Sequence, residues 1–156
     1  MKEIPAVKIR IAFAQILPGK NADENLLIGK NACIEAKENG ADIVLFPEMW
    51  SDGYRLPQNE AELRKLAIRK DSDFIHAFRD LAANLQMAVG ITFLESHDPK
   101  PLNSVVLFDR LGKEILHYSK VPTFTVPLPK SSSAVKKSSP PDSTASSSKA
   151  QVCTLE

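Results

Sequence analysis

Residues 41–54 read ADIVLFPEMWSDGY, and this stretch joins an apolar run to an acidic residue. The run at 43–46 is typical of a strand covered by other parts of the protein. Pro47 has a fixed φ and no N–H donor, so it ends the strand. In α/β proteins functional groups gather at the carboxyl ends of strands, which makes Glu48 a candidate general base. Position alone favours a plainer role, as a helix N-cap or an ion-pair partner.

Upstream of this stretch, the pattern predicts a strand followed by a helix. Apolar residues share one parity along residues 7–16, as in a strand, and Pro18-Gly19 breaks it. Residues 24–40 carry an apolar stripe that includes Cys33, with Asp23 as the expected N-cap and Gly40 as the stop. A short strand–helix–strand unit of this kind is usually right-handed and parallel.

Downstream, the sequence predicts a short helix in the segment 55–70 and a second helix over 72–87, followed by a strand at 88–96. The segments 102–109 and 113–121 flank a turn at 110–112 and predict an antiparallel hairpin. The predicted fold class is therefore α/β, with helices covering one side of a mixed sheet.

Composition and charge describe an ordinary soluble domain. The chain has 156 residues, 43% apolar and 25% charged, with a net charge of +1, so we expect neither a nucleic-acid nor a membrane partner. Two cysteines make no disulfide framework, and we expect a cytoplasmic protein. Residues 122–156 are rich in serine, proline and lysine and are predicted to be a disordered tail. The predicted domain is residues 1–121.

The segment HYSKV at 117–121 holds a second candidate. Along a strand, Tyr118 and Lys120 share one face, while the other face carries His117, Ser119 and Val121. Lys120 is either a solvated lysine that protects a sheet edge or a fixed positive charge aimed at an anion; taken alone, the edge role is favoured. Trp50 and Tyr54 fit a pocket lining and a loop that covers the core equally well.

These segments together resemble the nitrilase superfamily of carbon–nitrogen hydrolases. The resemblance covers residues 7–121 and rests on KIRIAFAQI, ADIVLFPEMWSDGY, LNSVVLFD and GKEILHYSKV. It implies an αββα sandwich, of which this segment supplies about half, and pairing into homo-oligomers. It also implies Glu48 as general base, Lys120 as the stabiliser of the oxyanion, and Trp50 and Tyr54 in the substrate pocket. The implied substrate is a small amide or nitrile, with amides ranked first, and no metal or organic cofactor is implied.

The nucleophilic cysteine of that family is not found by its sequence pattern. Cys33 is predicted to be a small core residue, and Cys153 lies in the predicted tail. We therefore expect a truncated, inactive family member whose missing second sheet leaves apolar strand faces exposed. The alternative is a non-catalytic half-domain that associates with itself or with a full-length relative.

Overall fold

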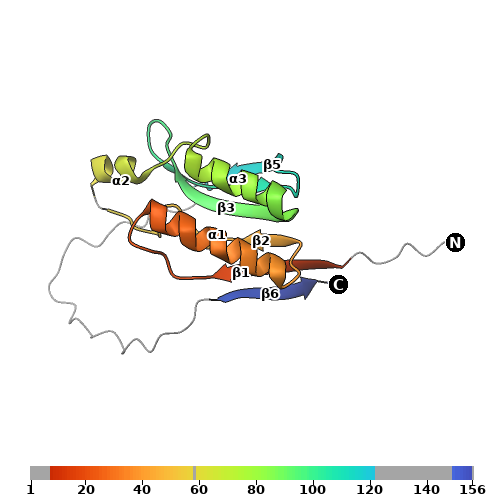
Figure 1. Ribbon diagram of the computed structural model, residues 1–156. Helices are drawn as coiled ribbons and strands as arrows, with labels where there is room; N and C mark the ends of the chain where they lie inside the picture. Colours follow the sequence, from red (N-terminus) through yellow and green to blue (C-terminus); the bar gives the residue numbers. More distant parts are fainter. Residues whose placement is uncertain (1–7, 58, 122–148, 156) are drawn as a thin grey trace, which may run out of the picture.

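The computed structural model describes residues 8–57, 59–121 and 149–155 as one sheet with helices packed on it (Figure 1). Its elements, in chain order, are β1 (Ile9–Gln15), α1 (Ala22–Glu38), β2 (Ile43–Leu45), α2 (Glu60–Leu66), α3 (Asp73–Leu85), β3 (Ala88–Glu95), β4 (Leu102–Phe108), β5 (Glu114–Ser119) and β6 (Lys149–Leu155). None of the helices in these described ranges has the length and apolarity that a membrane crossing requires.

The sheet is mixed, as the sequence predicts. Its strand order is β5-β4-β3-β2-β1-β6. Strands β1, β2 and β3 are parallel neighbours, while β3, β4 and β5 form an antiparallel meander. The parallel strand–helix–strand unit and the predicted hairpin are both confirmed.

The ends of α1 show which local signals act. Asn21, not Asp23, is the N-cap, because its side chain accepts a hydrogen bond from the Glu24 N–H at 2.9 Å. Asp23 lies in the first turn instead, where a negative charge is favourable near the helix N-terminus. The helix ends at Glu38 with Asn39 as its C-cap, and Gly40 follows with φ 78°, a conformation that glycine adopts without a Cβ penalty.

The core lies between the sheet and the helices α1 and α3. The buried strand residues in this core are Ala12, Ala14, Val44, Val89, Ile91, Phe93, Val106 and Phe108. In this core, Phe78 on α3 packs edge-on against Phe46, which follows β2, with ring centroids 5.3 Å apart. Gly29 lets α1 approach this cluster, because a Cβ there would lie 2.7 Å from the Phe78 ring.

The opposite face of the sheet stays open in the described part of the chain. Apolar side chains on this face are 44–54% exposed, a large fraction for residues of this kind; they are Ile9, Phe13, Leu116 and Tyr118. The parity along β1 explains the division, since small alanines face the helices and the larger Ile9 and Phe13 face outward. The expected exposure of apolar strand faces is therefore confirmed.

The predicted disordered tail needs one correction. Residues 149–155 form strand β6, which pairs antiparallel with β1 from Ile9↔Leu155 to Gln15↔Lys149. The sequence average over 122–156 is dominated by serine, proline and lysine and hides a seven-residue segment that includes the strand formers Val152 and Thr154. The outer edge of β1 offers unpaired backbone groups that this strand satisfies. Residues 122–148 and 156 lie outside the described residues.

Candidate functional site

Glu48 lies in a tight turn that leaves the sheet after β2. Met49 has φ 54°, and its carbonyl accepts the N–H groups of residues 52, 53 and 54. Thr92 on β3 fastens the turn from the side, since its hydroxyl donates to the Pro47 carbonyl and accepts the Trp50 N–H at 3.1 Å. The backbone on both sides of Glu48 is thereby held against the neighbouring strand.

A buried asparagine fastens the same turn to α1. Asn25 is fully buried, and its side chain donates to the Trp50 carbonyl at 3.1 Å. The Trp50 indole N–H donates back to the Asn25 carbonyl at 3.1 Å. This reciprocal pair makes Trp50 a core residue, only 1% exposed. The turn therefore has little freedom, because two elements hold it at once.

The structure brings the two predicted residues together across the sheet. Lys120 follows β5, and its Nζ lies 3.1 Å from Glu48 Oε1 although the two are 72 positions apart in sequence. The side chains of Lys120 and Glu48 are 60% and 44% exposed, so solvent reaches the pair. The predicted alternation along β5 also holds, since Tyr118 and Lys120 line one pocket while His117 and Ser119 contact Glu95 on the other side.

The pocket at this pair has a volume of about 470 Å³. Its lining consists of Phe46, Glu48, Thr92, Asn103, Ser104, Val105, Tyr118 and Lys120. Trp50 is not part of it, because its side chain is in the core, and Tyr54 is 55% exposed outside it. This pocket gives no support to the predicted substrate contacts of Trp50 and Tyr54, which stay a prediction.

Asn103 is the residue at this site that the sequence analysis missed. Its side-chain Nδ2 lies 2.5 Å from Glu48 Oε1, and its carbonyl accepts the Lys120 N–H at 2.8 Å. The available signal was a polar residue near the start of the strand segment LNSVVLFD, which is too common to single out.

Cys33 is not among the residues that line this pocket. Cys33 is fully buried on α1, and burial raises the pKa of its thiol to about 12, so the predicted core role is confirmed. Cys153 is opposite Ile11 in the pairing of β6 with β1. Strand β6 is at the edge of the sheet opposite β5, and Lys120 follows β5 directly. The described backbone therefore keeps Cys153 at a distance from the Glu48–Lys120 pair.

A polar cluster lies on the helix side of the sheet, below the end of β5. Glu95 Oε2 accepts hydrogen bonds from Ser104 at 2.6 Å and Ser119 at 3.4 Å, and lies 2.9 Å from His117 Nε2. Burial raises the pKa of Glu95, but these three partners outweigh burial and hold the pKa below its ordinary value. The cluster ties β3, β4 and β5 together next to Lys120.

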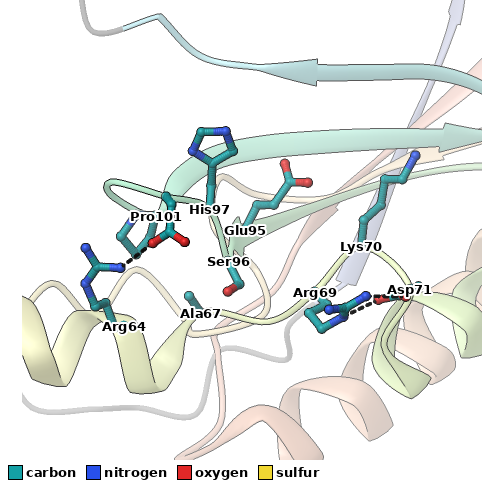
Figure 2. A pocket seen from close by; sticks show the side chains of 10 residues that line it. Arg64, Ala67, Arg69, Lys70, Asp71, Glu95, Ser96, His97 and Pro101 are labelled. Atoms are coloured by element: carbon teal, nitrogen blue, oxygen red, sulfur yellow. Dashed lines mark hydrogen bonds and ion pairs between the residues drawn. The ribbon is translucent and has the colours of Figure 1, made fainter.

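A second pocket, of about 560 Å³, opens beside this cluster (Figure 2). Figure 2 shows Arg64 on α2, Arg69 and Lys70 on the link to α3, and Glu95 at the end of β3. Each of the three cations already pairs with a carboxylate; the pairs are Arg64–Asp98, Arg69–Asp71 and Lys70–Glu114. This pocket therefore presents balanced charge and is a weaker candidate than the Glu48 pocket. In the residues that the structure describes, no group of three or more His, Cys, Asp or Glu side chains is placed to hold a metal ion.

Known proteins resemble this chain in sequence and in fold. A sequence model of the family described as carbon–nitrogen hydrolase matches residues 10–153, and so includes most of β6. A hydrolase of Schizosaccharomyces pombe is 26% identical over 123 residues, which are 77% of this chain and 37% of the yeast protein.

Two solved structures share the fold. The NitFhit protein of C. elegans has a TM-score of 0.66 at 23% identity, covering 78% of this chain and 30% of that protein. The NitN amidase from Nesterenkonia sp. AN1 has a TM-score of 0.61 at 22% identity, covering 75% of this chain and 46% of the amidase. The chain thus spans less than half the length of each of these relatives.

Proposed function

Because the chain belongs to the carbon–nitrogen hydrolase family, we propose that Glu48 and Lys120 are the base and the lysine of an amide-hydrolysing site. The observation that carries this proposal is the contact of 3.1 Å between Lys120 Nζ and Glu48 Oε1 in a pocket at the end of the strands. An exposed ion pair of this kind contributes little to stability, with a median of about 0–1 kcal/mol. A role in chemistry accounts for the fixed turn that carries Glu48 better than a role in stability does.

The proposed reaction is acyl transfer to a thiol. Glu48 takes the proton from a cysteine, the thiolate attacks the amide carbon, and the Lys120 ammonium stabilises the negative oxygen of the tetrahedral intermediate. The amine leaves with a proton, and water then hydrolyses the thioester. An amide ranks above a nitrile as the substrate, and the amidase of similar fold supports that order.

The same geometry supports the proposal that the 156-residue chain is catalytically incomplete. The reaction needs a thiol beside Glu48, and among the side chains that the structure describes the pocket lining holds none. Cys33 is buried in the core, and Cys153 is on the strand next to β1. Positioning of the reacting groups accounts for roughly 7–11 kcal/mol of barrier lowering in well-oriented reactions. We therefore expect no turnover from this chain by itself. A cytoplasmic location stays a prediction.

Binding and turnover test the two parts of this proposal separately. A small aliphatic amide is titrated into the ¹⁵N-labelled chain, and we expect NMR shift changes confined to residues of the Glu48 pocket. Glu48→Gln and Lys120→Met should reduce these changes, whereas Lys70→Met, which removes an ion pair with Glu114 elsewhere, should not. A titration that leaves the pocket resonances unmoved would refute the amide site.

The turnover assay measures ammonia release from the same amides. We expect the wild-type chain to match a blank without protein. Ammonia release that Glu48→Gln abolishes would contradict the proposed inactivity, and Cys153→Ala would then show whether that thiol reacts.

A second candidate function is that of a non-catalytic half-domain that associates with itself or with a full-length relative. The observation that favours it is the open apolar face of the sheet, where Phe13 is 44% exposed and Leu116 is 48% exposed. Sedimentation velocity over a concentration series tests self-association. We expect Phe13→Lys and Leu116→Lys to shift the distribution toward the monomer, and a wild-type chain that stays monomeric at every concentration would exclude self-association.

A further inference from the structure

Asn103 contacts both halves of the proposed site from one position. It lies on β4, between the strand beside the Glu48 turn and the strand that leads to Lys120. Its side-chain Nδ2 lies 2.5 Å from Glu48 Oε1. Its main-chain carbonyl accepts the Lys120 N–H at 2.8 Å. One residue therefore binds the Glu48 carboxylate with its side chain and the Lys120 main chain with its backbone.

The two contacts of Glu48 fall on the same carboxylate oxygen. The Asn103 amide and the Lys120 ammonium both donate to Oε1, and neither contact involves Oε2. A carboxylate only accepts, and an ammonium only donates. If Lys120 were the only partner of Glu48, its flexible side chain would let the ammonium bind either carboxylate oxygen as the carboxylate rotates. The short amide of Asn103 is attached to a sheet strand and therefore selects one oxygen.

We propose that Asn103 is a positioning residue that fixes the rotamer of Glu48, reserves Oε1 for Lys120 and leaves Oε2 to take the proton. This inference rests on the proposed function for the roles of Glu48 and Lys120. It assigns to Asn103 no contact with the reacting atoms. Its effect passes through the orientation of Glu48.

A purely structural role makes a different prediction. The Asn103 side chain is on the open face of the sheet, with Val105 and Tyr118 in the same pocket lining, while the core residues Val106 and Phe108 are on the helix side. Removing the amide therefore leaves the core packing intact. A structural role would change the free energy of unfolding without a selective change in proton exchange at Lys120 Nζ.

The test follows the Lys120 ammonium by ¹⁵N NMR in the full chain, at a mildly acidic pH that slows proton exchange with water. In Asn103→Leu, which matches the side chain in size without a donor, we expect exchange at Lys120 Nζ to be faster by about fivefold or more, as for the loss of one hydrogen bond to a charged group. Glu48→Gln should have the same effect, and Asn103→Gln, which keeps the amide, should restore part of the protection.

The matched control is Asn39→Leu. Asn39 is exposed, and its Nδ2 donates to the Glu35 carbonyl at 2.9 Å, away from the site. Asn103→Ser, whose side chain is too short to reach Glu48, repeats the test if Asn103→Leu does not give a dispersed spectrum. The proposal is overturned if both Asn103→Leu and Asn103→Ser leave the Lys120 exchange rate within about twofold of wild type, or if Asn39→Leu changes it equally.

This readout is independent of amide binding and of turnover. If the amide titration fails while Asn103→Leu exposes Lys120, the proposed function is wrong and the positioning by Asn103 stands as a geometric fact. If the amide binds while the exchange rate at Lys120 Nζ does not depend on Asn103, only the inference about Asn103 fails.

Discussion

Replacing Asp52 with asparagine should stabilise this protein at alkaline pH and have little effect in acid. Asp52 lies in the turn that carries Glu48 and is only 2% exposed. Both of its carboxylate oxygens are buried without a hydrogen-bond partner. Burial raises the pKa of Asp52 from 3.8 to about 6, against the opposing charge of Arg55. A buried carboxylate without partners opposes folding whenever it is ionised.

The sign follows from the direction of the shift. A carboxyl group whose pKa is raised on folding binds its proton more tightly in the folded state, so its contribution to stability is complete below about pH 3.8 and is lost as the pH rises through about 6. At about 1.4 kcal/mol per pH unit, the difference between 3.8 and about 6 corresponds to at most about 3 kcal/mol. The amide of an asparagine side chain stays neutral at every pH, so Asp52→Asn should recover up to this amount well above pH 6.

Urea unfolding at two pH values measures the effect. The single tryptophan, Trp50, is buried two positions from Asp52 and reports unfolding by fluorescence, with far-UV circular dichroism as a second probe. Asp109→Asn is the control of opposite sign, because the Lys113 and Leu111 N–H groups hold the pKa of Asp109 below its ordinary value. That variant should lose stability at high pH. A free energy of unfolding for Asp52→Asn that differs from wild type by the same amount in acid and in alkali would refute the reasoning.

Three further outcomes follow from the core and from the turn. Phe78→Ala removes a fully buried ring that packs between α1 and α3, and urea unfolding should show a loss of about 3–5 kcal/mol. Asn25→Leu leaves the Trp50 carbonyl and the Gly19 N–H without the buried side chain that now binds them, so it should cost about 1–3 kcal/mol and shift the Trp50 emission, whereas unchanged emission would contradict that role. Cys33, with a pKa raised to about 12 by burial, should resist iodoacetamide in the native protein and react only in denaturant, as peptide mass spectrometry would show.

The sequence predicted the central part of this fold because its signals are local. The apolar run before Pro47 and the capped helix between two strands each depend on neighbours in the chain, as does the turn of the β4–β5 hairpin. The same holds for Glu48, whose place at a strand end follows from the stretch around it. Lys120 was accessible only through alternation along a single strand and the family resemblance. The contact between these two residues requires the order of four strands, which no short pattern contains.

Two other features depend on distant pairing and were out of reach for the same reason. Strand β6 depends on its pairing with the distant strand β1. The composition of its seven residues is hidden when it is averaged with that of the long polar segment before it. The sequence left two equal roles for Trp50, as part of a pocket lining or as part of a loop that covers the core. Its hydrogen bond with the buried Asn25 decides for the core. A pattern confined to the stretch around Trp50 cannot include Asn25, which lies 25 positions away.

The register between β4 and β5 shows most clearly why the site cannot be predicted from single segments of the sequence. The β4–β5 register shifts between Leu107, which pairs with Leu116, and Phe108, which pairs with Glu114, so Ile115 has no partner. A one-residue slip moves every later side chain of a strand to the other face, and an extra residue in one strand has this effect on the pairs beyond it. If the register that pairs Phe108 with Glu114 continued without this shift, Tyr118 would be opposite Ser104 on the helix side, and Lys120 would leave the open face. The ion pair of Glu48 and Lys120 therefore depends on an irregularity in an exposed hairpin. The alternation that predicted Lys120 gave the correct face only because the strand is regular from Leu116 onward.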